Sequence, residues 1–328
     1  MLSGFIKNNE KTLKDFISFF LVLFIIFVYS LRYEVGFDWL NYTNIFRGIG
    51  NYRLEPVYET LFEFVDYRGF IFLSTLFPIG SLFFMALRYC NDSPLFMFLF
   101  VISGSLFLLI SPLRQSFSLG FVYTAFLLKD RVKFIPILLI SIGVIFHTSN
   151  IIFLAVFYFS NISINKNSAL LFLSFAFVSN QYVFDAAVFL VENVSILSPY
   201  AGYFDPSNEY SSSRVSSGVG VMAEIFTILW FVIISKNDSD DKNYNLLINL
   251  TYLYVFMVII SVSMDIFARF KIGLLPFVVI FMVNTISGKI KNAKYAIPFI
   301  ITSLFFVSRY VKFILETSHF YPFSIMPM

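Results

Sequence analysis

Cysteine, histidine and charged residues are scarce in this chain, and each scarcity excludes a class of protein. The one cysteine, Cys90, cannot form an intrachain disulfide. The two histidines, His147 and His319, are too few for a histidine-rich metal site, so we expect neither a metal nor another cofactor. Charged residues make up 13% of the chain, whereas a soluble domain carries about 25%. The net charge of +3 is too small to indicate a nucleic acid partner.

Apolar residues make up 58% of the chain, with 46 phenylalanines and a mean hydropathy of +0.80. The apolar runs do not alternate with polar residues, and they are far longer than the roughly 9–11 residues of a barrel strand. We therefore expect an all-α integral membrane protein of the lipid bilayer, in which residues 1–328 form one polytopic domain.

The apolar runs predict about eleven transmembrane helices, some of them short or broken. Their ranges are 15–31, 69–87, 94–110, 113–128, 134–147, 149–160, 168–190, 218–235, 245–264, 270–287 and 294–311. The first run resembles a signal peptide, but it is long and no small-x-small cleavage site follows it. We interpret it as an uncleaved span whose N-terminus is cytoplasmic.

The stretch 134–160 could form one long tilted helix or two short ones. In its middle lies the polar tetrad His147-Thr-Ser-Asn150, which a lipid-facing helix would not carry. A single span would also turn the later lysine-bearing loops outward, against the positive-inside rule. We therefore predict two short or broken helices that meet near His147.

Lysine and arginine are sorted to opposite sides of this topology. The inner loops carry mostly lysines, and arginines lie at the outer ends of the spans. The outer arginines are Arg32, Arg47, Arg53, Arg68, Arg114, Arg214, Arg269 and Arg309. The positive-inside rule does not call for cations there. Because a guanidinium is a planar fork that suits phosphate, the sorting indicates an anion at the outer face.

Four of these arginines, Arg32, Arg114, Arg214 and Arg269, are candidates to bind the anion. Each alone could snorkel to the interface or pair with a neighbouring acid. Together they favour a lipid-linked phosphate or pyrophosphate, whose charge they would neutralise as it leaves.

Two long outer loops lie beside these arginines. In the first, residues 32–68, Glu55-Pro56 reads as the start of an amphipathic helix on the membrane surface. The second, residues 191–217, is rich in serine and tyrosine and includes Tyr200 and Tyr203. It could contact carbohydrate, act as a gate or be an ordinary linker.

Two residues could accept the proton of an attacking sugar hydroxyl. His147 lies among polar neighbours at membrane depth, although a structural histidine at a helix break is the alternative. Asp38 could be the base instead, or it could cap the helix that follows it. Aromatic residues such as Trp39 and Tyr42 could stack on sugar rings or anchor the interface.

Five short motifs occur in order along the chain. They are Arg32-Tyr-Glu-Val-Gly36-Phe-Asp38-Trp39-x-x-Tyr42, Glu55-Pro56-Val-Tyr58, Arg114-Gln115-Ser116, Phe146-His147-Thr-Ser149 and Arg269-Phe270. In this order they resemble the EpsG-type and Wzy-type bacterial polysaccharide polymerases, which include O-antigen polymerases. The likeness covers residues 30–160 well, and only the surroundings of Arg269 in the second half.

The resemblance implies a multi-spanning glycosyltransferase of the GT-C type in the bacterial inner membrane, with its active site facing the periplasm. It would transfer a growing glycan from undecaprenyl pyrophosphate to the terminal sugar of an incoming lipid-linked repeat unit, without a metal. A chain-length regulator protein is an implied partner. Pyrophosphate would contact Arg32, Arg114 and Arg269 and be covered by Arg214, with His147 or Asp38 as base. The residues expected to contact glycan are Trp39, Tyr42, Glu55, Gln115, Tyr200 and Tyr203.

Two other functions stay open from the residues alone. A flippase or transporter of lipid-linked glycans would be expected to have two related halves, and we find no internal repeat. A membrane acyltransferase acting on surface sugars would use a histidine but would not need the arginines.

Overall fold

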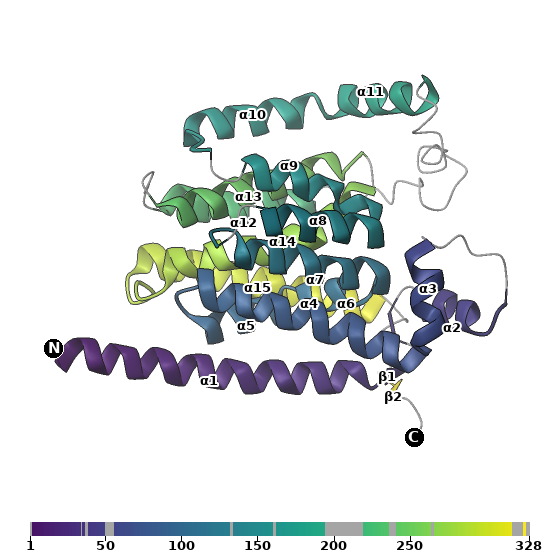
Figure 1. Cartoon of the computed structure of the whole chain (residues 1–328). Coiled ribbons are helices and arrows are strands. Elements are labelled where there is room, and N and C mark those ends of the chain that lie inside the picture. Colours follow the sequence, from purple (N-terminus) through teal and green to yellow (C-terminus); the bar gives the residue numbers. More distant parts are fainter. Residues whose placement is uncertain are drawn as a thin grey trace. The chain divides into compact units, whose positions relative to one another are not determined.

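The computed structural model describes residues 2–33, 35–36, 39–49, 56–131, 134–159, 162–193, 219–235, 241–263, 266–316 and 324–325. The chain divides into two compact units (Figure 1). Unit 1 contains Met1–Phe159 and Ser303–Met328, and unit 2 contains Ser160–Thr302. The last part of the chain therefore returns to the unit in which the chain began.

Unit 1 consists of helices and one short strand pair. Its elements are α1 (Leu2–Ser30), β1 (Arg32–Tyr33), α2 (Trp39–Phe46), α3 (Pro56–Phe64), α4 (Tyr67–Tyr89), α5 (Ser93–Ile102), α6 (Ser105–Ile110), α7 (Leu113–Leu128), α8 (Phe134–Phe146), the 3-10 helix η1 (Thr148–Ile151), α9 (Ile152–Phe159) and β2 (Ser324–Ile325). Unit 2 holds α10 (Lys166–Val178), α11 (Asn180–Asn193), α12 (Val219–Ile234), α13 (Lys242–Ile260) and α14 (Ile266–Ile286). Helix α15 (Ala293–Glu316) begins in unit 2 and ends in unit 1.

The expected all-α membrane fold is confirmed. Within the described residues, four helical stretches are long and apolar enough to cross a membrane: Glu10–Ser30, Tyr67–Tyr89, Lys242–Ile260 and Arg269–Ile286. The bent pair α10 and α11 adds a fifth if it counts as one span. Each predicted span falls on one or two helices, but most of these are shorter than a full crossing. The count of eleven spans therefore stays a prediction.

One predicted break is present in the structure, and the predicted spans 94–110 and 168–190 are each divided between two helices. The break near His147 is confirmed, because α8 ends at Phe146 and His147 has the extended conformation φ −158°, ψ 108° before η1 begins. The run 94–110 is divided as well, between α5 and α6. Gly104 has φ +73° there, a left-handed conformation that favours glycine.

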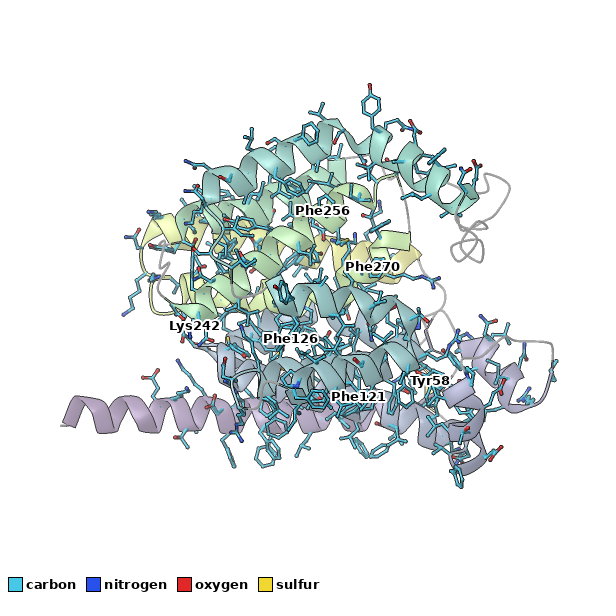
Figure 2. All side chains as sticks on the ribbon, turned by 45° about the horizontal axis from the view of Figure 1, so that its top comes forward. Tyr58, Phe121, Phe126, Lys242, Phe256 and Phe270 are labelled. Carbon is cyan, nitrogen blue, oxygen red and sulfur yellow. The ribbon has the colours of Figure 1, made fainter. Side chains whose placement is uncertain are left out.

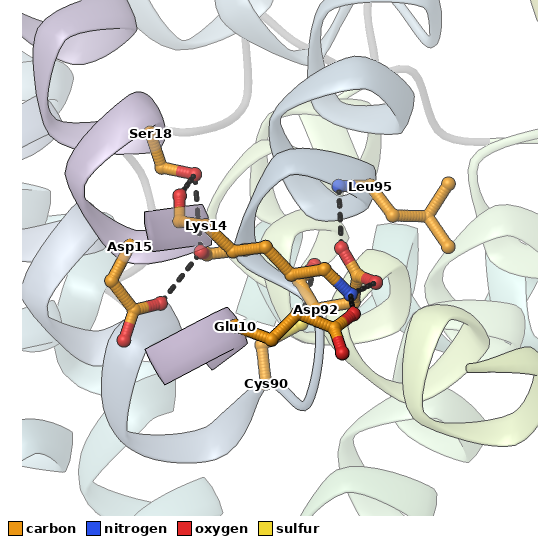
Figure 3. Close-up of polar contacts among 8 residues, drawn as sticks. Glu10, Lys14, Asp15, Ser18, Cys90, Asp92 and Leu95 are labelled. Atoms are coloured by element: carbon orange, nitrogen blue, oxygen red, sulfur yellow. Dashed lines mark hydrogen bonds and ion pairs between the residues drawn. The ribbon is translucent and has the colours of Figure 1, made fainter. Parts of the chain in front are cut away.

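Polar contacts fix α1 against the start of α5 at one end of unit 1 (Figure 3). Lys14 Nζ lies 3.1 Å from a carboxylate oxygen of Asp92, and Ser93 Oγ donates to Asp15 at 2.7 Å. Ser18 Oγ donates to Ser93 Oγ at 3.0 Å. At the same end, an ion pair of 2.6 Å joins Arg88 to Asp130. The middle of α1 is thus held to the start of α5 by an ion pair and two hydrogen bonds.

Buried aromatic side chains lie in the interior of each unit, among them Phe126 in unit 1 and Phe277 and Phe281 in unit 2. Figure 2 draws the side chains on the ribbon and labels Phe126. Helices α4 and α7 approach closely, because Gly120 leaves room for the ring of Phe77. The Phe77 ring lies between Phe117 and Phe121, with centroid distances of 5.6 and 4.7 Å, so it has little space to move.

We predict that Gly120→Ala lowers the stability of the protein by about 1–3 kcal/mol, because the added methyl group overlaps the Phe77 ring. Gly80→Ala is the matched control, since Gly80 lies in α4 and a Cβ there meets nothing within 4 Å. The melting temperatures of the two variants in detergent measure the difference. Equal melting temperatures would contradict the close approach at Gly120.

Candidate functional site

The candidate site lies at the end of unit 1 opposite the paired charges of Figure 3. Here α1 ends, α4 begins, α6 meets α7 and α8 ends. Figure 1 shows β1, α2 and α3 at this end. Two sequence candidates lie on either side of the short turn between α6 and α7, residues 111–112: Arg32 bonds to Ile110, the last residue of α6, and Arg114 is the second residue of α7.

Arg32 is almost completely buried, with 2% of its surface exposed. Its Nη1 donates to the carbonyl of Tyr29 and to Thr75 Oγ1, both at 2.7 Å, and its Nη2 donates to the carbonyl of Ile110 at 3.1 Å. These acceptors belong to α1, α4 and α6, so one side chain ties three helices together. Burial lowers the pKa of Arg32 to about 10, and the group therefore stays positively charged at neutral pH.

The segment after Arg32 lies against the same turn. Gly36 has φ +108°, and a Cβ at this position would lie 3.3 Å from Ser111 Oγ. Both the backbone conformation and the tight fit therefore favour glycine. This accounts physically for the glycine in the first motif.

Arg114 begins α7 directly after the turn and is held by two tyrosines. The Tyr42 hydroxyl accepts hydrogen bonds from Arg114 Nε at 3.0 Å and from its backbone N–H at 3.3 Å. The Tyr58 hydroxyl donates to the Arg114 carbonyl at 3.0 Å. The Nε contact orients the planar guanidinium, which is the geometry that bidentate phosphate binding requires.

Both tyrosines belong to an aromatic cluster that packs α2 and α3 onto the rest of unit 1. Tyr42 and Tyr58 are buried with Phe70, Ile71 and Leu113. The predicted helix after Glu55 is confirmed as α3, with Glu59 and Glu63 exposed. For Tyr42 and Tyr58 the sequence left stacking on sugar or anchoring at the interface open. In the structure both bond to Arg114, and contact with glycan stays a prediction.

His147 lies in the break between α8 and η1, and this break is anchored on α7. Asn150 is fully buried, and its Nδ2 donates to Ser118 Oγ at 2.7 Å. Gly143 lets α8 approach α7, because a Cβ there would lie 3.1 Å from the Ser118 carbonyl. Ser118 is four residues after Arg114, which is about 6 Å along the helix axis. The candidate base and a candidate phosphate-binding arginine are thus attached to neighbouring turns of α7.

The other sequence candidates have different positions. Gln115 is buried, and its carbonyl accepts a hydrogen bond from Ser118 Oγ at 2.7 Å. Trp39 is half-buried at the start of α2. Arg269 belongs to unit 2, where it is exposed near the start of α14. Five candidates lie outside the described residues: Asp38, Glu55, Tyr200, Tyr203 and Arg214.

Sequence reasoning missed Glu224, which is 3% exposed within the apolar helix α12. Tyr254 of α13 donates a hydrogen bond to its Oε1. Among the described residues, Glu224 and Arg32 are the most deeply buried charged side chains. An acidic residue inside an apolar run was the available signal, since such a residue is costly in a membrane and needs a partner.

The described residues therefore define an all-α multi-pass membrane protein with buried and oriented arginines at one end of unit 1. No group of three or more His, Cys, Asp or Glu in those residues is placed to hold a metal ion.

The family model described as "EpsG family" matches residues 15–325, and the chain belongs to the EpsG family. This family is associated with polysaccharide polymerases of the glycosyltransferase kind. The comparisons found no match among curated proteins and none among solved structures.

We predict that Asn150→Ala destabilises the protein by about 1–3 kcal/mol, because it removes the buried hydrogen bond that seats the His147 break on α7. Ser149→Ala is the control, since the buried Ser149 hydroxyl has no hydrogen-bond partner among the described residues. Thermal unfolding in detergent compares the two. An equal loss in both variants would show that the Asn150 contact contributes nothing particular.

A second pair of variants tests the buried carboxyl. Tyr254→Phe leaves Glu224 without its phenol donor, and we expect a loss of about 1–3 kcal/mol. Tyr252→Phe on the same helix is the control, because the Tyr252 hydroxyl has no described hydrogen-bond partner. Melting temperatures that fall equally would refute the assigned role of the pair.

Proposed function

We propose that this protein is a polymerase of O-antigen or a related polysaccharide. It transfers a growing glycan from undecaprenyl pyrophosphate to the terminal sugar of an incoming lipid-linked repeat unit. The observation that carries the proposal is that Arg32 and Arg114 lie on either side of one short turn, since Arg32 bonds to the last residue of α6 and Arg114 belongs to the first turn of α7. The membership in the EpsG family supplies the class of substrate.

The surroundings of Arg32 favour an anion. A buried guanidinium is costly unless an opposite charge compensates it. Its three hydrogen bonds go to neutral oxygens, and no carboxylate among the described residues pairs with it. A guanidinium has five N–H donors, and acceptors in the described part of the chain use three of them. A phosphate group provides both the charge and the acceptors.

The chemistry needs little beyond charge stabilisation and one base. The acceptor hydroxyl attacks the anomeric carbon of the growing glycan, a new C–O bond forms, and the bond from that carbon to pyrophosphate breaks. Arg114, oriented by Tyr42, and Arg269 neutralise the charge on the leaving pyrophosphate. His147 takes the proton of the acceptor hydroxyl, with Asp38 as the alternative base. We further propose that Arg214 covers the pyrophosphate.

The proposed orientation places the N-terminus in the cytoplasm and the site at the periplasmic face of the inner membrane. Lys14 and Arg88 lie at the end of unit 1 opposite Arg32 and Arg114. The positive-inside rule assigns lysine-bearing loops to the cytoplasmic side. The arginine end of the unit then faces the periplasm, where repeat units would be joined.

Conservative substitutions test the phosphate-binding role. Arg114→Lys and Arg269→Lys keep the charge but lose the planar fork, so we expect each to reduce polymer formation by about 10–1,000-fold. Arg47→Lys is the control, because Arg47 is an exposed arginine at the end of α2 on the same side. The assay is the ladder of products that purified protein makes from lipid-linked repeat units.

Normal long-chain product in both variants, at equal expression, would refute the role of these arginines. The same assay separates the polymerase from a flippase or an acyltransferase, since only a polymerase lengthens the glycan.

A further inference from the structure

The strand that contains Arg32 pairs with the C-terminal part of the chain. Strands β1 and β2 are antiparallel, with Arg32 opposite Ile325 and Tyr33 opposite Ser324. Nearly 300 residues of sequence separate the two strands, so the chain returns to the candidate site at its far end. Figure 1 shows the two strands at the same end of unit 1 as α2 and α3.

A second contact brings the C-terminal part of the chain to the same region. In the part of α15 that belongs to unit 1, the Tyr310 ring lies 5.3 Å from the Phe107 ring, and Phe107 is 5.5 Å from Tyr29. Val35, three residues after Arg32, is buried in the same cluster. The surroundings of Arg32 therefore depend on residues from both ends of the chain.

These contacts complete the constraint on Arg32. Its side chain is held by acceptors on three helices, whereas its backbone is held by β2. A pair of two-residue strands is marginal alone, but here it acts on a residue whose side chain is already fixed. Without β2, β1 would lose the strand that pairs with it in the described part of the chain.

We propose that Ser324–Ile325, which we name the C-terminal clasp, is a positioning segment that holds Arg32 in the orientation in which it binds phosphate. The inference rests on the proposed function for its ligand and goes beyond it in assigning a role to the C-terminus. Removing the clasp weakens phosphate binding and leaves the membrane fold in place, because the helices of unit 1 pack without it.

The first experiment tests the pairing itself. In a Cys90→Ala background, Tyr33→Cys and Ser324→Cys place two thiols directly opposite each other, where Cβ atoms are about 4.5–5.5 Å apart. A disulfide requires Cα atoms within about 7 Å of each other, and opposed residues of an antiparallel pair meet this requirement, since their Cα atoms are about 4.5–5.5 Å apart. The control pair is Leu31→Cys with Ser324→Cys, because Leu31 lies two residues before Tyr33 and just outside β1. After mild oxidation, a thiol-reactive mass tag counts the free thiols.

The expected result is that the opposed pair loses both thiols and the displaced pair keeps them. If both pairs lose their free thiols, or if both pairs keep them, the pairing of the clasp with β1 is refuted. This result does not depend on whether the protein is a polymerase.

The second experiment tests positioning with inorganic pyrophosphate as the probe. We expect pyrophosphate to raise the melting temperature of the full chain. Deletion of residues 324–328 should raise, by about tenfold, the pyrophosphate concentration that gives half of this stabilisation. The disulfide-locked variant keeps the full-chain concentration. If the clasp only stabilises the fold, its deletion lowers the melting temperature in the absence of pyrophosphate but leaves the half-effect pyrophosphate concentration unchanged. That result would overturn the inference.

Failure of pyrophosphate to stabilise even the full chain also overturns the positioning role. Failure of the proposed function is recognised separately, as the absence of a product ladder from a full chain that still binds pyrophosphate.

Discussion

The Arg32 guanidinium, bonded at once to α1, α4 and α6, is the interaction on which this end of the molecule depends. Without it, the carbonyls of Tyr29 and Ile110 and the hydroxyl of Thr75 would lose their common donor. The turn that it fixes also receives Gly36 and begins the helix of Arg114. The charge makes the arrangement costly in isolation and favourable once an anion is bound, so the same group serves both the architecture and the proposed chemistry.

Much of this organisation could be predicted from local patterns. A polar tetrad inside an apolar run predicted the break at His147, and Pro56 after an acid predicted α3. Both signals are local, because a helix that loses its apolar face or gains a capping residue changes within a few positions. The ordered short motifs identified the family for the same reason. Sorting of lysine and arginine pointed to the end of unit 1 at which the structure holds Arg32 and Arg114.

Other features depend on partners distant in sequence and left no local signal. The hydrogen bonds that join Tyr42 and Tyr58 to Arg114 could not be predicted, because the partners are 72 and 56 residues apart in sequence. The pairing of Tyr254 with Glu224, and that of β1 with β2, needs knowledge of which helices and ends are neighbours. The division at Gly104 was missed because a single glycine in an apolar run is compatible with a continuous helix.

The shortness of α8 bears on how a substrate arrives. A helix of 13 residues is about 20 Å long, roughly 10 Å less than the hydrocarbon layer of a bilayer. If α8 starts at one surface of the bilayer, its polar end at His147 would lie below the headgroups of the other surface. A phosphate carried on a membrane-embedded chain would reach such a recess by diffusion within the leaflet, whereas a water-soluble sugar nucleotide would have to descend into it. In the proposed polymerase, the length of this one helix would therefore favour a lipid-linked donor over a soluble one.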